Sequence, residues 1–448
     1  MTLSDSIAIV LAAGMGTRMK SSRPKVMHEV AHRPMLAHVL RAAHQAGLSR
    51  RIVVIGLDMD EVGEAVGDIP GETSFAIQTE RRGTGHAVMA ARQALDGHRG
   101  TVFILFGDTP LLRAETITAM ASGLSGADIS VLGFRPLDPS GYGRLLLDAD
   151  GGLEAIVEHK DATEHQRRTD FCWSGLMAFS AARHLDLLDR LTTDNAQGEY
   201  YLTAIVEIAR KTGLRVAAVE CDAEDVMGVN SRAELAKAEA LMQDRLRVRA
   251  MAAGVTMADP ASVYLAHDTE LGADVVLEPG IVFGPGVTVG EGAHIRAFSH
   301  LEGARIGAGA AVGPYARLRP GANIGAGAKI GNFVEVKKSD IGANAKVSHL
   351  SYIGDAEIGA RANIGAGTIT CNYDGFNKWR TVIGEGAFIG SNSALVAPVR
   401  IGRSAFVASG SVVTADVEDD ALVLGRARQE VKLGWAARFR AKFAKPER

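Results

Sequence analysis

An aliphatic residue recurs about every six positions between Leu277 and Val413, and this repeat constrains the fold more than any other feature. A Gly often follows the aliphatic residue, and a small residue tends to stand three places later. Such a hexapeptide repeat is typical of a parallel β-helix, in which each hexad supplies one short strand and one turn. Three hexads predict one triangular coil, and stacked coils bury a continuous aliphatic core. The predicted core positions are Leu277, Phe283, Val289, Ile295, Leu301, Ile306, Val312, Leu318, Ile324, Ile330, Val336, Ile341, Val347, Ile353, Ile358, Ile364, Ile383, Ile389, Leu395, Ile401, Val407 and Val413.

Length and composition predict a two-domain protein of the cytoplasm. A chain of 448 residues exceeds the size of one compact core. A net charge of -3 with scattered Lys and Arg gives no sign of nucleic-acid or membrane binding. Three cysteines (Cys172, Cys221 and Cys371) are too far apart for a metal cluster and indicate a reducing compartment. We expect a cytoplasmic location, because the N-terminus lacks the features of a secretory leader and no apolar stretch reaches membrane length.

The first half of the chain predicts an α/β domain with a mainly parallel sheet. Residues 7–12 form a wholly apolar run, which is typical of a central strand buried on both faces. Further apolar runs alternate with amphipathic segments, and that alternation favours parallel strands joined by helices. The expected strands after the first are residues 52–56, 102–106 and 129–134, and the expected helices are residues 35–46, 86–95, 114–124 and 198–212.

A single helix is predicted to connect the two domains. Residues 231–234 (SRAE) form a capping-box pattern, apolar residues follow at helical spacing, and Gly254 is a candidate C-cap. A helix of about 20 residues spans roughly 30 Å. The expected organisation is a first domain at residues 1–230, a helical linker at 231–251 and a β-helix domain at 252–448, whose basic tail after Arg426 is partly helical.

The first strand runs directly into a Gly-rich loop with positive charge nearby. The loop lacks the Gly-Lys-Ser/Thr of a P-loop and fails the dinucleotide-binding pattern at its third Gly. It still places backbone N–H groups after a strand, where phosphates bind in α/β folds, with Arg18 and Lys25 close by. Asp108 follows another buried strand, where a metal-phosphate site belongs. Alternatively, the loop is a plain turn and Asp108 caps a turn or helix before Pro110.

Motifs around this loop carry a family resemblance. Residues 11–19 (LAAGMGTRM), followed by Pro24 and Lys25, resemble the signature of the sugar-1-phosphate nucleotidyltransferases. Further motifs stand in the order of that family: Gln78, 83–86 (GTGH), 106–108 (FGD), 141–144 (GYGR), 158–161 (EHKD) and 228–230 (GVN). The whole chain resembles the family of bifunctional bacterial enzymes that combine N-acetylglucosamine-1-phosphate uridyltransferase with glucosamine-1-phosphate N-acetyltransferase. For that family the expected fold is a Rossmann-like nucleotidyltransferase domain, a connecting helix and a left-handed β-helix.

For the N-terminal half, the resemblance implies attack of N-acetylglucosamine-1-phosphate on UTP with release of pyrophosphate. Arg18 and Lys25 then neutralise charge on the leaving pyrophosphate, and Asp108 and Asn230 match magnesium ligands. The residues that match UTP or UDP-sugar contacts are Leu11, Ala12, Ala13, Gly14, Lys25, Gln78, Gly83, Thr84, Phe106, Gly107, Asp108, Gly143, Glu158, Trp173 and Asn230. Three positions depart from the family pattern: Met15 replaces a usual Lys, Trp173 a usual Asn, and Phe106 a common Tyr.

Polar and charged residues are inserted into, or interrupt, the hexapeptide repeat in four places: residues 317–321 (RLRPG), 332–338 (NFVEVKK), 348–355 (SHLSYIGD) and 370–378 (TCNYDGFNK). Loops and exceptions on a rigid scaffold are where binding and catalysis concentrate. The resemblance makes His349 the general base for acetyl transfer, with Glu335 as a candidate orienting partner. It implies that glucosamine-1-phosphate is bound by Arg319, Lys337, Tyr352 and Asn363. It implies that acetyl-CoA is bound by Ala366, Asn372, Tyr373, Ser391, Ser409 and Arg426.

Two functional interpretations follow. The first is a bifunctional enzyme that acetylates and then uridylylates, which the family carries out as a homotrimer. The second is a single nucleotidyltransferase whose β-helix serves only for assembly. The string around His349 and the loop from Cys371 to Lys378 favour the first, because an assembly module does not need them. Cys371 itself is expected to line the pocket or pack, since the family transfers acetyl directly and needs no thiol nucleophile.

Overall fold

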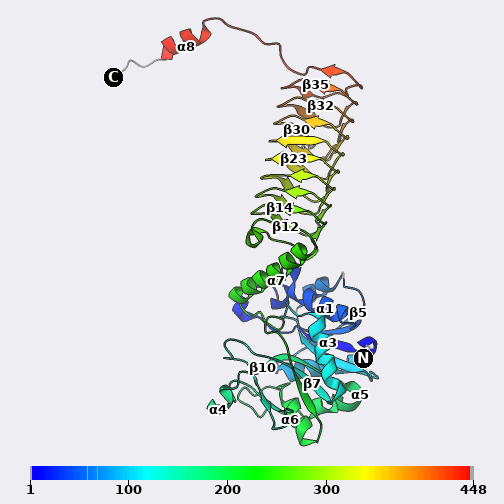
Figure 1. Ribbon diagram of the computed structural model, residues 1–448, viewed down its shortest axis with the longest axis vertical. Coiled ribbons are helices and arrows are strands. Elements are labelled where there is room, and N and C mark those ends of the chain that lie inside the picture. The colour runs from blue at the N-terminus through cyan, green and yellow to red at the C-terminus, as the bar shows by residue number, and fades with distance from the viewer. Residues whose placement is uncertain (1–2, 58, 68, 444–448) are drawn as a thin grey trace, which may run out of the picture. The chain divides into compact units, whose positions relative to one another are not determined.

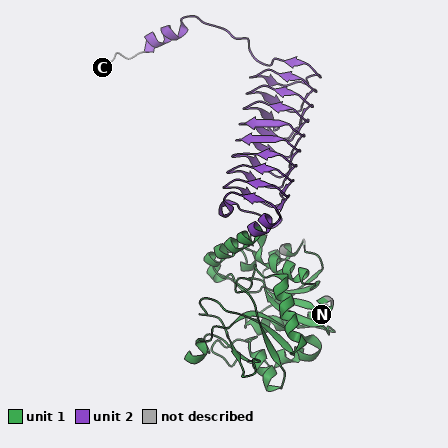
Figure 2. Cartoon of the chain, viewed as in Figure 1, with its two compact units in different colours: residues 1–246 green, residues 247–448 purple. Residues whose placement is uncertain are grey.

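A computed structural model describes residues 3–57, 59–67 and 69–443. The chain divides into two compact units, residues 1–246 and 247–448 (Figure 2). The division falls inside helix α7 (Arg232–Ala252), which the sequence predicted as a connector. The domain boundaries expected from the sequence, at residues 230 and 251, lie just before that helix and one residue before its end, and they stay predictions.

The first unit contains a mixed sheet in the order β11-β7-β10-β6-β1-β4-β5, with β8 and β9 attached at β10 (Figure 1). Strands β4, β1 and β6 pair in parallel, as the alternating pattern predicted, whereas β10 runs antiparallel between β6 and β7. The strands are β1 (Ile7–Leu11), β2 (Glu29–Val30), β3 (Arg33–Pro34), β4 (Arg50–Gly56), β5 (Glu72–Gln78), β6 (Thr101–Phe106), β7 (Ile129–Phe134), β8 (Arg144–Leu147), β9 (Leu153–Val157), β10 (Cys172–Ser180) and β11 (Val216–Glu220).

The helices expected from the sequence are present with shifted ends. The segment expected at residues 86–95 is α2 followed by a separate 3-10 turn, η5 (Arg92–Leu95). The helix expected from residue 198 begins only at Ala204, because Gly198 has a φ of 65° and the chain turns there. The α-helices are α1 (Met35–Gln45), α2 (Thr84–Ala90), α3 (Ala114–Ser122), α4 (Glu164–Arg167), α5 (Ala181–His184) and α6 (Ala204–Lys211). The remaining 3-10 turns are η1 (Leu3–Asp5), η2 (Thr17–Met19), η3 (Lys25–Met27), η4 (Asp60–Val66), η6 (Gly123–Ser125) and η7 (Leu185–Arg190).

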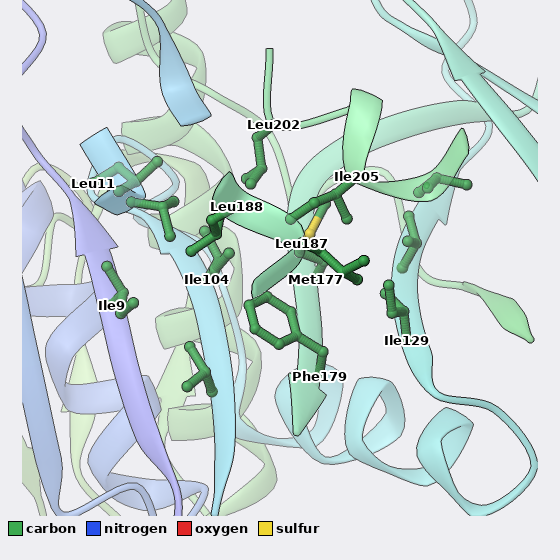
Figure 3. Close-up of a cluster of buried hydrophobic side chains, with 14 of the residues drawn as sticks. Ile9, Leu11, Ile104, Ile129, Met177, Phe179, Leu187, Leu188, Leu202 and Ile205 are labelled. Carbon is green, nitrogen blue, oxygen red and sulfur yellow. The ribbon is translucent and has the colours of Figure 1, made fainter. Parts of the chain in front are cut away.

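Two apolar clusters form the core of this unit. Alternate residues of β1 enter different clusters: Ile9 belongs to one with Ile104 and Phe179, and Val10 to the other. Figure 3 shows part of the first cluster, where side chains of Ile9, Ile104, Met177 and Phe179 gather. Because successive side chains of a strand point to opposite faces, β1 is buried on both sides, as its apolar run predicted.

The second unit is a parallel β-helix with three sheets (Figure 1). The first sheet contains β12 (Thr256–Met257), β14 (Val276–Leu277), β17 (His294–Ile295), β20 (Ala311–Val312), β23 (Lys329–Asn332), β26 (Lys346–His349), β29 (Asn363–Ile364), β32 (Phe388–Ile389), β35 (Phe406–Val407) and β37 (Leu422–Val423). The second contains β13 (Glu270–Leu271), β16 (Thr288–Val289), β19 (Ala304–Ile306), β22 (Ala322–Ile324), β25 (Ser339–Ile341), β28 (Ala356–Ile358), β31 (Thr381–Ile383) and β34 (Val399–Ile401). The third contains β15 (Val282–Phe283), β18 (His300–Leu301), β21 (Arg317–Leu318), β24 (Glu335–Lys337), β27 (Tyr352–Gly354), β30 (Ile369–Cys371), β33 (Ala394–Val396) and β36 (Val412–Val413).

The hexapeptide prediction is confirmed residue by residue. All the aliphatic positions named above are buried, and each lies in one of the short strands. From β13 to β33, each strand pairs in parallel with the strand three places later, so residues one coil apart stack directly. The loop from Asn372 to Arg380 interrupts the spacing without breaking this register: Ile358 pairs with Ile383, and Ile383 pairs with Ile401. The left-handed coil implied by the resemblance stays a prediction.

Helix α7 begins with the predicted capping residues. The backbone N–H of Glu234 donates to the Ser231 hydroxyl (3.3 Å), and the Glu234 carboxylate accepts from the backbone N–H of Asn230 (2.7 Å). Gly254 ends the helix with a φ of 97°. The tail contains α8 (Trp435–Phe443), as its partly helical pattern predicted. Within the described ranges, every helix is too short or too polar to cross a membrane.

Candidate active sites

A cavity of about 290 Å³ opens at the carboxyl ends of strands β1 and β6. Its volume is near the lower end of the range for small-molecule sites. It brings together many of the residues that the resemblance assigned to the nucleotide. Those predicted residues are Leu11, Ala12, Ala13, Gly14, Lys25, Gln78, Gly83, Thr84, Phe106 and Asp108. Four further lining residues were missed: Val26, Arg81, Ala87 and Glu199.

Lys25 lies at the centre of the charged end of this cavity. Its ammonium donates to Oδ1 of Asn230 (2.9 Å) and forms an ion pair with Asp108, and both charged side chains are largely buried. Gly16 makes this placement possible, because a Cβ at Gly16 would lie 2.5 Å from Cβ of Lys25. The structure therefore groups three predicted residues that stand far apart in the sequence.

The backbone of the cavity wall is held by specific hydrogen bonds. The N–H of Gly107 donates to the carbonyl of Leu11 (2.9 Å), which joins the ends of β6 and β1. Nε of Arg81 donates to the carbonyl of Ala13 (2.9 Å), and the Gln78 amide donates to the carbonyl of Gly83 (3.2 Å). Arg81 adds a positive charge that was not predicted from the sequence, although Arg81 lies between the predicted residues Gln78 and Gly83.

A second group of predicted residues lies around Trp173. Its backbone N–H donates to the carbonyl of Gly143 (2.9 Å), and its ring meets Phe106 edge to face with 6.4 Å between centroids. A Cβ on Gly143 would lie 3.6 Å from the Glu158 carboxylate. Burial raises the pKa of Glu158, while a hydrogen bond from Thr203 (3.3 Å) opposes that rise. Gly143, Glu158 and Trp173 thus adjoin one another, as a shared sugar subsite requires.

Arg18 and Met15 stand apart from the described cavity lining. Both side chains are exposed on the Gly-rich loop and its 3-10 turn η2, and Met15 is 62 % exposed. Arg18 is not among the described residues that line the cavity. That role stays a prediction, with Lys25 and Arg81 as the cations that the cavity contains.

The two predicted magnesium ligands converge on one position. Oδ2 of Asp108 and Oδ1 of Asn230 both accept from the Lys25 ammonium, so a cationic group already lies between two oxygen donors. Oxygen donors of this kind suit Mg²⁺, which usually keeps several waters and phosphate oxygens in its shell. Across the residues that the structure describes, no cluster of three or more His, Cys, Asp or Glu could hold a metal alone. The donor set therefore fits an ion that is bound together with substrate phosphates.

In the β-helix, His349 stacks on Asn332 of the preceding coil. The two residues are register partners in β26 and β23, and Nδ1 of His349 lies 2.7 Å from Oδ1 of Asn332. The expected orienting residue, Glu335, instead pairs with Arg319 (Nη1 to Oε1, 2.8 Å). Asn332 was not predicted as a site residue, although it stands one coil before His349.

Basic residues gather on the next sheet. Lys337 belongs to β24 and lies close to Lys378 of the interrupting loop. The neighbouring Lys378 ammonium lowers the pKa of Lys337, and Arg319 adds to that effect. Two ammonium groups and a guanidinium in one place indicate a binding site for an anion. Lys378 was part of the predicted loop but was not assigned to the sugar phosphate.

The interrupting loop is fixed by its acidic residues. The Asn372 amide donates to Asp355, one coil earlier, and the Asp374 carboxylate accepts from Nε1 of Trp379 (2.7 Å). Backbone N–H groups of Asn377 and Phe376, with the Trp379 indole, lower the pKa of Asp374 to about 2. The loop is therefore ordered around charged groups, and Tyr373 within it is 60 % exposed.

Four of the six residues predicted for acetyl-CoA (Ala366, Ser391, Ser409 and Arg426) form a row along one corner of the β-helix. The row starts beside His349, whose backbone carbonyl accepts from the N–H of Gly367 (3.4 Å); Gly367 directly follows Ala366. The backbone N–H of Asn392 donates to the carbonyl of Ala366 (2.7 Å), and that of Gly410 donates to the carbonyl of Ser391 (2.8 Å). Ala366, Ser391 and Ser409 therefore stand in successive coils. A Cβ on Gly410 would lie 4.0 Å from Cδ of Arg426, at the end of the row. Of the predicted sugar contacts, Tyr352 pairs with Glu335 in register, and Asn363 lies one coil after Lys346.

These two sites define a transferase with one catalytic unit in each half. Residues 8–197 match the MobA-like NTP transferase domain family, and residues 303–338 and 380–415 match the bacterial transferase hexapeptide family. Proteins named "Bifunctional protein GlmU" are similar over nearly the whole chain. That of Azorhizobium caulinodans is 56% identical over 442 residues (98% of each chain), and that of Parvibaculum lavamentivorans 56% over 443 residues (99% of this chain, 98% of the relative). That of Bradyrhizobium sp. is 53% identical over 441 residues (98% of each chain).

The chain belongs to the GlmU family of bifunctional proteins. The family resemblance predicted from the sequence is confirmed, and so is the prediction of a bifunctional transferase.

Proposed function

We propose that the chain makes UDP-N-acetylglucosamine in two steps. The β-helix transfers acetyl from acetyl-CoA to glucosamine-1-phosphate, and the N-terminal unit then transfers uridylyl from UTP to N-acetylglucosamine-1-phosphate. What supports both steps is the separation of the predicted residues into two groups, one around Lys25 and one around His349. Relatives named as bifunctional share more than half of their residues with this chain over both groups.

In the N-terminal site, uridylyl transfer needs alignment and charge neutralisation. An oxygen of the sugar phosphate attacks the α-phosphorus of UTP, and the bond to pyrophosphate breaks. The Gly-rich loop supplies backbone N–H groups beside the cavity, and Lys25 and Arg81 supply positive charge. Gly143, Glu158 and Trp173 hold the sugar. Glu158 is half-buried, and its burial raises the pKa of the carboxyl group.

Magnesium is the expected cofactor of this step. Asp108 and Asn230 would hold the ion, which neutralises phosphate charge when bound. Lys25 places positive charge between their oxygens, at the end of the cavity where the phosphates would lie.

In the C-terminal site, His349 acts as the general base. Nε2 accepts a proton from the amine of glucosamine-1-phosphate as the nitrogen attacks the thioester carbonyl, and CoA leaves as the thiolate. The side-chain oxygen Oδ1 of Asn332 accepts from Nδ1–H of His349, so the free lone pair of the imidazole lies on Nε2. Lys337, Lys378 and Arg319 bind the sugar phosphate. The row Ala366, Ser391 and Ser409 lies beside CoA.

Assembly as a homotrimer in the cytoplasm completes the proposal. Phe298, Tyr315 and Phe333 stack on one corner with 5.1 and 5.4 Å between ring centroids, and about half of each side chain is exposed. This stack runs along the same corner as His349, since Phe333 follows Asn332 directly. A neighbouring copy seated on the stack would cover apolar surface and adjoin the acetyl-transfer site.

Two assays on the same preparations test the proposal. Thiol release from acetyl-CoA with glucosamine-1-phosphate measures acetyl transfer, and pyrophosphate release from UTP with N-acetylglucosamine-1-phosphate measures uridylyl transfer. We expect His349→Ala to lower only the first, by roughly 10²–10⁴-fold, and Asp108→Asn to impair only the second. His300→Ala and Asp150→Asn change exposed residues of the same kinds and leave both activities intact. Full acetyl transfer by His349→Ala would exclude the base assignment, and absence of acetyl transfer in the parent would leave the β-helix as an assembly module.

A further inference from the structure

The C-terminal helix α8 carries an aromatic ridge that packs on no other element among the residues that the structure describes. Trp435, Phe439 and Phe443 recur every four residues and stack on one another with 4.9 Å between successive ring centroids. All side chains of α8 are exposed, and the three aromatic residues are 49–61 % exposed. A nine-residue helix with exposed side chains is marginal in water without a surface to pack on.

A matching apolar stripe is exposed on the last coils of the β-helix. Phe388, Phe406 and Leu422 are register partners in strands β32, β35 and β37, and their side chains are 38, 46 and 62 % exposed. The rings of Phe388 and Phe406 stack with 4.4 Å between centroids at 15°. The outward positions of the three coils before this stripe are polar: Lys329, Lys346 and Asn363. Val276, near the other end of the sheet, is also exposed (36 %), but its register partners Thr256 and His294 are polar. The apolar stripe therefore lies at the end from which the tail emerges.

We propose that α8 docks its aromatic ridge on the stripe formed by Phe388, Phe406 and Leu422 of its own chain. The two surfaces agree in length. The ridge spans about 12 Å at 1.5 Å per residue, and three stacked strands span roughly 10 Å at about 4.8 Å per strand. Each aromatic residue of the ridge then meets one coil of the stripe.

Charge favours the same docking. Arg438, Arg440 and Lys442 flank the aromatic residues of α8, and the helix contains no acidic residue. Glu418 and Asp420 are exposed just before Leu422, at the edge of the stripe. Basic side chains of the docked helix therefore lie within reach of acidic side chains on the last coil.

The linker allows the helix to fold back. Eleven residues separate Val423, the end of β37, from Trp435. Fully extended they reach about 36 Å, several times the width of the stripe. The stripe begins on the strand from which the linker departs, so the chain needs only a reversal of direction.

Cross-linking of the full-length chain tests this docking. In a Phe406→Cys/Phe439→Cys variant, a short bismaleimide should join the two thiols within one chain. The control is Tyr264→Cys/Phe439→Cys, which places the second thiol on an aromatic position of an early coil with similar exposure (48 %, against 46 % for Phe406). Because docking raises the local concentration of one thiol at the other, we expect about tenfold faster intramolecular cross-linking than in the control. The single-cysteine variants report any reaction with the native thiols.

Equal rates in the two double variants would overturn the proposal. Predominantly dimeric cross-linked product would also overturn it, because α8 would then dock on a second copy. Trypsin gives an independent readout through Arg438 and Arg440. We expect Phe406→Asp to speed cleavage within α8 about tenfold, since cleavage follows the population of the undocked helix. Tyr264→Asp should leave the cleavage rate unchanged, and an unchanged rate in Phe406→Asp would contradict docking.

Discussion

Gly16→Ala should impair uridylyl transfer by displacing Lys25. Gly16 has a φ of 62°, and an added Cβ would lie 2.5 Å from Cβ and 3.4 Å from Cα of Lys25. Cβ is the first atom of the Lys25 side chain, so the flexible end of that side chain cannot relieve the clash. The backbone at Lys25 must move, and its ammonium moves with it away from Asp108 and Asn230.

The expected effect has two parts. A left-handed backbone conformation costs a residue with a Cβ about 1–2 kcal/mol, which lowers stability without touching the site. A displacement of roughly 1 Å in a group that aligns the reacting phosphates costs on the order of 10²-fold in rate. Activity should therefore fall much further than the loss of stability explains.

Gly213→Ala is the matched control. Gly213 has a φ of 82°, so it carries the same backbone cost, but a Cβ there meets nothing within 4 Å. Pyrophosphate release and thermal unfolding are measured for both variants, with thiol release as a check on the second unit. We expect both variants to lose stability and Gly16→Ala alone to show about 100-fold lower uridylyl transfer. Equal uridylyl transfer in the two variants would refute the role given to the position of Lys25.

Two further predictions concern one residue in each site. Asn332→Ala should lower kcat for acetyl transfer about 2- to 10-fold with unchanged KM values, because it removes one hydrogen bond worth about 0.5–1.5 kcal/mol from His349. Asn323 is an exposed Asn of the same β-helix, and Asn323→Ala should leave kcat unchanged. Glu158→Gln should raise Tm relative to the parent increasingly as pH rises above the ordinary carboxyl pKa. Burial raises the pKa of Glu158, so the stability contributed by its protonated form is lost as pH rises through that raised pKa. Exposed Glu164→Gln should show no such trend, and a constant Tm difference for Glu158→Gln would contradict the burial argument.

The β-helix could be predicted closely from the sequence because its repeat is local and periodic. Each buried aliphatic position, such as Ile330, follows from its spacing alone. The N-terminal sheet was harder, because the antiparallel strand β10 lies between β6 and β7 through pairings across long stretches of chain. Spacing along the sequence contains no information on such pairings.

The site residues divide in the same way. The grouping of Lys25 with Asp108 and Asn230 was expected from the motifs, and the structure brings the three together. The partner of His349 was expected to be Glu335, a charged residue, yet the imidazole contacts Asn332. The repeat contained the signal, since residues one coil apart stack. Arg81 had no such signal, because its contact with Ala13 depends on how two separate strands end.

The loop from Asn372 to Arg380 shows how this architecture can gain new parts. Its residues leave the stack at a corner, and the ladder resumes with Ile383 paired to Ile358 as if nothing had been inserted. In a fold whose strands interlock through side chains of several elements, an insertion of this length shifts the core. In a stack of coils, such an insertion forms a side loop and leaves the strand register unchanged. A structural repeat can therefore acquire a binding loop in a single step.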